Sequence, residues 1–76
     1  MLKKQMVGST YRHFKGTLYQ VIDIAIHSEN AEPLVIYKGV ADSEYTWARP
    51  LSMFISEVDR KKYPDVAQQM RFEKVS

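Results

Sequence analysis

The sequence predicts one small domain that is mostly β and forms a compact β-barrel of about five strands with one or two short helical turns. The chain has 76 residues, which is enough for one hydrophobic core and too few for two domains. It has no cysteine, so packing must hold the fold together without disulfides or a thiolate zinc site. Its β-branched and aromatic residues occur in short runs between polar turns, which is typical of a small β domain.

We expect residues 1–8 to form a flexible N-terminal tail and residues 9–76 to form the single domain. The tail carries two lysines but lacks the run of about 7 to 15 apolar residues that a signal peptide needs. The longest apolar region, residues 21–26, is interrupted by Asp23 and falls far short of the ~20 residues that span a bilayer. The sequence therefore predicts a cytoplasmic protein with no membrane partner.

A β-hairpin is predicted at the start of the domain. Residues 10–14 contain Tyr, His and Phe and favour a strand, Lys15 and Gly16 supply a turn, and residues 17–27 form a long second strand. Both faces of this second strand are partly apolar, so the strand is either central or bent at Asp23 to serve two parts of a barrel. The alternation places on one face Ile22, Ile24 and Ile26, and on the other Tyr19, Val21 and Ala25.

Two further strands are predicted in the middle of the chain. Residues 34–38 are β-branched and aromatic, and Gly39 ends or kinks this third strand. Residues 45–49 form the fourth strand, because Pro50 biases the residue before it toward an extended backbone.

The C-terminal third is predicted to be part helical and part extended. Pro50 can open a helical turn whose apolar face consists of Leu51, Phe54, Ile55 and Val58, spaced three and four apart. A second helical turn can form over residues 64–69, and residues 70–75 then form the last strand.

Several blocks of the sequence, in this order and spacing, resemble a known bacterial family. The blocks are Tyr11–Gly16, Tyr19, Val21, Ala25, His27–Glu29, Val35–Tyr37, Trp47–Leu51 and Met53–Phe54, followed by closing segments at 57–59, 62–65 and 71–73. They are similar to the domain-of-unknown-function family 1653, whose members are short stand-alone proteins. The resemblance covers nearly everything after Gly8 and implies an SH3-like barrel, but it implies no activity. Residues 40–45 depart from it, since many members have a loop rich in tyrosine and glycine there.

No enzyme, metal site or cofactor is predicted. His13 and His27 are the only imidazoles, and they lie on different predicted strands without a metal-binding spacing. Each fits a half-buried histidine that bonds to the backbone. Ser28 points to the opposite face of a strand from His27, so the pair is poorly arranged for proton transfer.

The leading interpretation is a non-catalytic binding module that recognises a protein segment or a small ligand. Aromatic rings stack on planar groups and arginine holds anions. The candidate binding residues are Tyr11, His13, Tyr37, Trp47 and Arg49. The chain has only nine aromatic residues to build its core, so some of these rings can be core residues instead. The edge strands of a small sheet need protection, and pairing with a second copy can supply it, so we expect a monomer or a weak homodimer.

The alternative interpretation is a nucleic-acid-associated barrel, which stacks bases on aromatic rings beside basic grooves. The residues that would contact nucleic acid are Lys3, Lys4, Arg60, Lys61 and Lys62. We do not favour it, because the formal net charge is only +2 and the two tail lysines account for all of it. Acidic residues also flank the second basic group.

Overall fold

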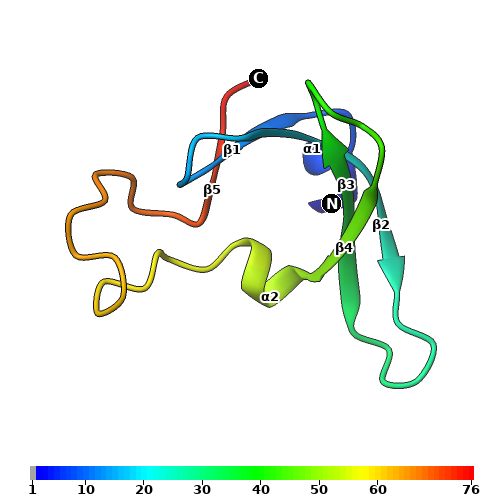
Figure 1. Cartoon of the computed structure of the whole chain (residues 1–76). Coiled ribbons are helices and arrows are strands. Elements are labelled where there is room, and N and C mark those ends of the chain that lie inside the picture. The colour runs from blue at the N-terminus through cyan, green and yellow to red at the C-terminus, as the bar shows by residue number, and fades with distance from the viewer. Residues whose placement is uncertain (1) are drawn as a thin grey trace.

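In the computed structural model the chain forms a five-stranded antiparallel sheet that is strongly curved (Figure 1). The structure describes residues 2–76. The elements are α1 (Leu2–Met6), β1 (Thr10–His13), β2 (Leu18–Ile26), β3 (Pro33–Gly39), β4 (Thr46–Pro50), α2 (Leu51–Phe54) and β5 (Phe72–Lys74). In space the strands lie in the order β4-β3-β2-β1-β5, so β4 and β5 are the two edges. The prediction of a mostly β domain with five strands is confirmed.

The sheet does not close into the expected barrel. Within residues 2–76 no backbone ladder joins β4 to β5. Instead, α2 and the chain that follows it lie between these two edges (Figure 1), and the Phe54 ring of α2 stacks on the Phe72 ring of β5 at a centroid distance of 4.0 Å. Side-chain packing thus fills the gap between β4 and β5, which we call the seam.

Of the two possibilities left open for β2, the structure shows features of both: β2 is the central strand of the sheet, and a β-bulge interrupts it beside Asp23. The pairing of β2 with β3 shifts register between Val21 and Asp23, so Ile22 is an extra residue in the strand. The extra residue reverses the alternation of faces. Val21 before the bulge and Ile24 after it therefore both pack in the core, whereas Ile22 is exposed. The predicted face shared by three isoleucines is wrong for this reason.

Residues 2–6 form α1 rather than the flexible tail predicted for residues 1–8. Met6 is only 2% exposed and belongs to the core. The Lys3 Nζ lies 3.1 Å from a carboxylate oxygen of Asp23 in β2, so an ion pair also holds α1 to the sheet. Met1, the first residue of the predicted tail, lies outside the described residues.

The helical turn predicted after Pro50 is confirmed as α2, but it is shorter than its apolar spacing indicated. Phe54 is fully buried and Leu51 packs against the core, whereas Ile55 is exposed. Residues 64–69 form no helix, which corrects the second predicted turn. The Arg60 guanidinium instead donates to two backbone carbonyls of this segment and holds it as a loop. No helix in the described part of the chain is long and apolar enough to cross a membrane.

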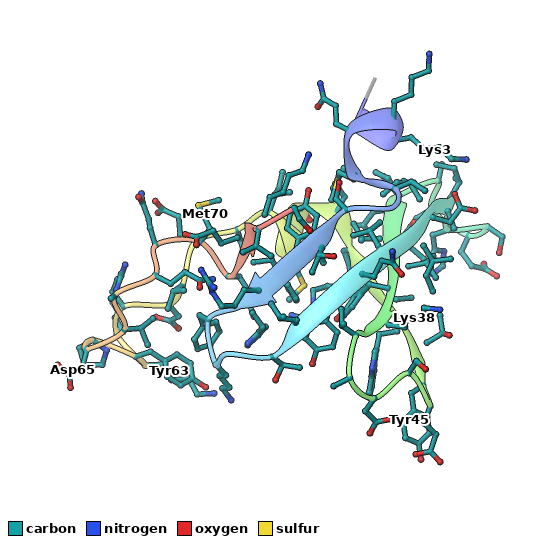
Figure 2. All side chains as sticks on the ribbon, turned by 90° about the horizontal axis from the view of Figure 1, so that it is seen from above. Lys3, Lys38, Tyr45, Tyr63, Asp65 and Met70 are labelled. Carbon is teal, nitrogen blue, oxygen red and sulfur yellow. The ribbon has the colours of Figure 1, made fainter. Side chains whose placement is uncertain are left out.

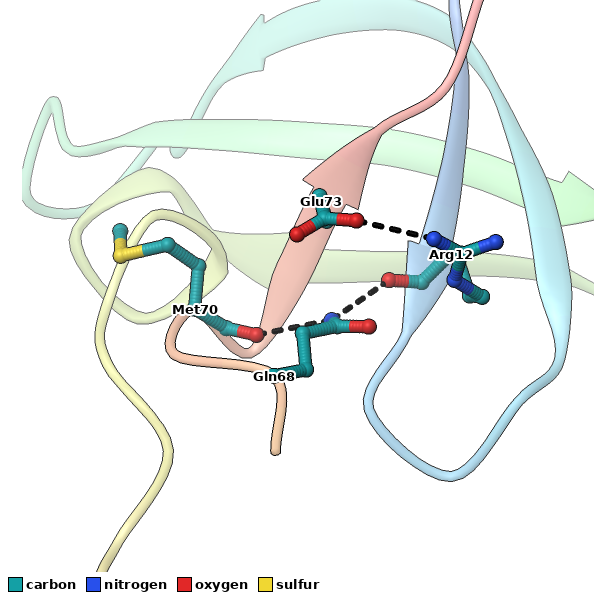
Figure 3. Close-up of polar contacts among 4 residues, drawn as sticks. All are labelled: Arg12, Gln68, Met70 and Glu73. Atoms are coloured by element: carbon teal, nitrogen blue, oxygen red, sulfur yellow. Dashed lines mark hydrogen bonds and ion pairs between the residues drawn. The ribbon is translucent and has the colours of Figure 1, made fainter. Parts of the chain in front are cut away.

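Polar contacts fasten β5 and the preceding loop to β1 (Figure 3). Arg12 Nη2 donates to Glu73 Oε1 at 2.9 Å on the exposed side of the sheet. The Gln68 side-chain amide donates to the carbonyl of Arg12 at 3.0 Å and to that of Met70 at 2.8 Å. The three-residue β5 is therefore secured by side chains as well as by its ladder with β1.

The core is a set of rings that meet mainly edge to face. Tyr19 and Tyr37 lie 5.2 Å apart, Tyr37 and Phe72 lie 5.6 Å apart, and Tyr37 and Phe54 lie 5.5 Å apart between ring centroids. The most buried residues are Met6, Val21, Val35, Tyr37, Phe54, Val58 and Phe72. The strands β2, β3 and β5, together with α1 and α2, each contribute at least one of these buried residues, whereas β1 contributes the half-buried Tyr11.

Candidate binding site

The five residues predicted to form one binding surface do not all lie on the surface. The Tyr11 ring is half-buried and meets the Phe54 ring at 5.2 Å, nearly perpendicular to it. Burial raises the pKa of Tyr11. Tyr37 is only 5% exposed, so these two rings belong to the core. Trp47, in contrast, is 49% exposed.

Trp47 lies at a pocket of about 470 Å³ between the start of β2 and the loop that joins β3 to β4. The exposed ring of Tyr45 lies 5.8 Å from the Trp47 ring between centroids. Val40 is also exposed, and Leu18 and Tyr19 complete the apolar wall. We call this site the Trp47 pocket; Figure 2 shows that Tyr45 lies at the tip of its loop, away from the centre of the molecule.

The loop of residues 40–45, which departs from the family resemblance, forms one wall of the Trp47 pocket. Gly39 at its start has no room for a side chain, because a Cβ there would overlap the carbonyl group of Asp42. The Asp42 carboxylate accepts a hydrogen bond from a backbone N–H two residues later, at 3.1 Å. The backbone N–H of Val40 donates to the carbonyl of Leu18 at 3.0 Å. Backbone contacts thus hold this wall against β2.

Two arginines lie at the seam. Arg49 Nε donates to the Tyr37 hydroxyl at 3.2 Å, and the Arg49 guanidinium carbon lies 5.6 Å from the centroid of the Phe72 ring. Arg71 Nε donates to the hydroxyl of Ser56 at 3.1 Å. Neither arginine is among the ion pairs formed within residues 2–76. Each is therefore oriented by a neutral hydroxyl rather than by a carboxylate.

His13 lies beside these arginines. Its ring meets the Phe72 ring at a centroid distance of 5.0 Å, nearly perpendicular to it. Its Nδ1 accepts a hydrogen bond from the backbone N–H of Lys15 at 3.1 Å, which leaves the proton of the neutral imidazole on Nε2. Burial first, and then the charges of Arg49, Lys15 and Arg71, lower the pKa of His13. We call these four side chains the cationic cluster.

The remaining histidine is separate from this cluster. His27 follows β2, and its Nδ1 accepts a hydrogen bond from the backbone N–H of Glu29 at 3.1 Å. Across residues 2–76, no three acidic or histidine side chains gather in a way that could hold a metal ion.

The basic residues of the nucleic-acid interpretation lie in two places. Figure 2 shows Lys3 on α1 and Tyr63, next to the second basic group, at opposite ends of the molecule. Lys3 pairs with Asp23, and Arg60 donates to backbone carbonyls. The structure does not join these residues, Lys3, Lys4, Arg60, Lys61 and Lys62, into one basic groove.

Sequence reasoning identified Trp47, Arg49 and His13 but missed the pocket wall and Arg71. The pocket wall could have been predicted from the sequence, because Val40 and Tyr45 are apolar side chains in the polar loop that follows Gly39. No sequence pattern indicated Arg71, because its position at the seam depends on two strands that are distant in the sequence.

Comparisons with known proteins agree with this architecture. The model of a family described as a protein of unknown function, DUF1653, matches residues 9–74. The crystal structure of a DUF1653 protein from Bordetella bronchiseptica is similar, with a TM-score of 0.75 and 26% sequence identity over 97% of this chain and 92% of that chain. No curated protein matches the sequence. The chain therefore belongs to the DUF1653 family, as the blocks of its sequence indicated.

Proposed function

We propose that this protein is a non-catalytic binding module that holds an extended segment of another protein in the Trp47 pocket. The observation that carries the proposal is the position of the only tryptophan in the chain, half-exposed at a pocket with mainly apolar walls. Tryptophan and tyrosine are the side chains that most often anchor a partner in an interface.

The apolar side chains around the pocket form a patch rather than scattered single residues. The four that are at least 39% exposed are Leu18, Val40, Tyr45 and Trp47. A domain of this size needs apolar burial for its own stability. A group of large apolar side chains left in contact with water is typical of an interaction surface.

The neighbouring edge strand favours an extended segment as the occupant. Trp47 lies in the exposed start of β4, residues 46–48, at the end of the strand that does not lead into α2. Among the described strands β4 pairs only with β3. An extended chain can add to such an edge through its backbone while alternate side chains enter an adjacent pocket. A pocket of about 470 Å³ suits a few large side chains of such a segment.

The composition of the pocket supports binding without catalysis. The ionisable side chains lining it in the described chain are Tyr19, Asp42 and Tyr45. Asp42 accepts a hydrogen bond from a backbone N–H. Among residues 2–76, no histidine or lysine lines the pocket to act as a base with a nucleophile.

The proposal can be tested with peptides of about a dozen residues displayed on phage, selected against the whole protein. Enriched peptides are then titrated against it while the emission of Trp47 is recorded. We expect a blue shift of the emission, because bound apolar side chains exclude water from the indole. Val40→Asp should weaken binding about tenfold or more, because it places a charge in the apolar wall.

The matched control is Ile26→Asp, since Ile26 is even more exposed, at 64%, and does not line the pocket. It should leave peptide affinity unchanged. Peptides that bind wild type and Val40→Asp equally well would overturn the proposal. A pocket that takes small metabolites but no peptide would overturn the choice of a protein segment.

A further inference from the structure

We propose that the cationic cluster is a binding site for an oxyanion, either a carboxylate or a phosphate group, held between Arg49 and Arg71. The site lies at the seam and shares no residue with the Trp47 pocket, so it goes beyond the function proposed above. Arg49 belongs to β4, and Arg71 immediately precedes β5. The site therefore spans the seam, with one arginine from the chain at each edge of the sheet.

The side chains of Arg49 and Arg71 have different bonding partners from those of the other two arginines. Arg12 pairs with Glu73 at 2.9 Å (Figure 3), and Arg60 donates both terminal nitrogens to backbone carbonyls. Within residues 2–76, the side chains of Arg49 and Arg71 donate only through Nε, each to a neutral hydroxyl. Their terminal NH₂ groups remain as donors for a ligand.

The ring of Phe72 is the common neighbour of these side chains. The Arg49 guanidinium carbon lies 5.6 Å and the His13 ring 5.0 Å from the centroid of that ring, and Arg71 is the residue before Phe72. Arg49, Lys15 and Arg71 all act on this one imidazole, and the structure pairs none of the three with a carboxylate among the described residues. Grouping like charges at partly buried positions opposes folding unless a counter-charge is supplied. An anion would supply it, and Nε2–H of His13 would add one more donor.

The shape of the donors selects an oxyanion. A guanidinium group presents parallel N–H bonds that match the paired oxygens of a carboxylate or a phosphate. The hydroxyls of Tyr37 and Ser56 already orient the two guanidinium groups. Much of the side-chain ordering that binding requires is therefore present before the anion arrives.

The test is an NMR titration of the whole protein with inorganic phosphate and, separately, with acetate, at constant ionic strength. The readout is the imidazole resonance of His13, with His27 as the internal reference. We expect a saturable shift at His13 and an increase in its pKa when the anion is bound. Saturation with phosphate alone would assign the site to phosphate groups, and saturation with both would assign it to oxyanions in general.

Variants distinguish specific binding at the cationic cluster from nonspecific attraction of anions to the protein. Arg71→Gln should weaken the binding about tenfold or more, as expected for loss of a charge-assisted hydrogen bond. Arg71→Lys keeps the charge without the fork and should fall between this variant and wild type. Arg12→Gln removes the same charge outside the cluster and should leave the affinity unchanged.

Absence of a saturable shift at His13 with both anions would overturn the inference, and this result needs no variant to fold. Equal loss of affinity in Arg12→Gln and Arg71→Gln would also overturn it. Val40→Asp, which tests the Trp47 pocket, leaves the cationic cluster intact. The two proposals can therefore fail independently.

Discussion

Replacing Trp47 with alanine separates a binding role from a structural role for this side chain. Its exposed fraction is 49%, and a tryptophan has up to about 250 Å² to bury, so roughly 125 Å² is removed from water. At about 25 cal/mol per Å² this burial contributes at most about 3 kcal/mol. Alanine retains part of it, and the unfolded chain already buries part, so we expect Trp47→Ala to reduce the free energy of unfolding by about 1–2 kcal/mol.

Phe54→Ala provides the scale for comparison. Phe54 is fully buried and stacks on Phe72, so its truncation should cost about 3–5 kcal/mol. For 76 residues, an unfolding entropy of about 2.1 cal/mol/K per residue converts 1 kcal/mol into about 6 °C of Tm. We therefore expect Trp47→Ala to lower the Tm by about 6–12 °C, and Phe54→Ala to lower it by about 18–30 °C.

The assay is thermal unfolding followed by far-UV circular dichroism, because Trp47→Ala lacks the only tryptophan fluorophore. A loss of Tm in Trp47→Ala as large as that in Phe54→Ala would refute the reasoning. It would mean that the indole stabilises the core, and it would remove the observation on which the proposed function depends.

Three further predictions concern the loop and two titrating groups. Gly39→Ala should cost about 1–3 kcal/mol, because its Cβ would overlap the Asp42 carbonyl; an unchanged Tm would contradict this close contact. The pKa of His13 is lowered in the folded state, so its contribution to stability should be lost as the pH falls below about 6.5 toward the folded pKa. The free energy of unfolding of His13→Gln, measured with denaturant, should depend less on pH in this window. A profile identical to that of wild type would show that His13 does not cause the loss of stability. A backbone hydrogen bond, and then Lys3, lower the pKa of Asp23. Asp23→Asn should therefore lower the stability at neutral pH, and the variant should no longer lose that stability on acidification below about pH 4. Amide exchange in α1 that stays as slow as in wild type at neutral pH would contradict the role of Asp23 in holding α1.

The strands could be predicted because their residue types are locally distinctive. Each predicted strand overlaps an observed one, and Pro50 marked the end of β4 and the start of α2. The bulge at Ile22 limited the prediction of faces, since one inserted residue reverses the alternation. Asp23 indicated where the strand bends, but a sequence does not show that a bend is a bulge rather than a smooth curve.

The parts that could not be predicted depend on contacts between distant segments. A five-residue helix such as α1 is too short for a periodic signal, and the burial of Met6 depends on the sheet beneath it. Tyr37 and Trp47 are directly paired on β3 and β4, yet one is buried and the other is half-exposed. Both are aromatic residues in predicted strands, so the sequence does not distinguish their roles. In the fold, Phe54 of α2 and Phe72 of β5 pack against Tyr37, whereas Trp47 lies beside Tyr45 at the pocket.

The short strand β5 also has a consequence for how the chain folds. Its pairing with β1 joins distant residues such as Arg12 and Glu73, which are 61 positions apart. Such distant contacts form slowly because a large loop must close first. Until Phe72 arrives, the ring of Phe54 lacks its stacking partner, and the inner aromatic face is open to water. We expect completion of this face to be the slow step of folding, and we expect the protein to be most susceptible to aggregation during that interval.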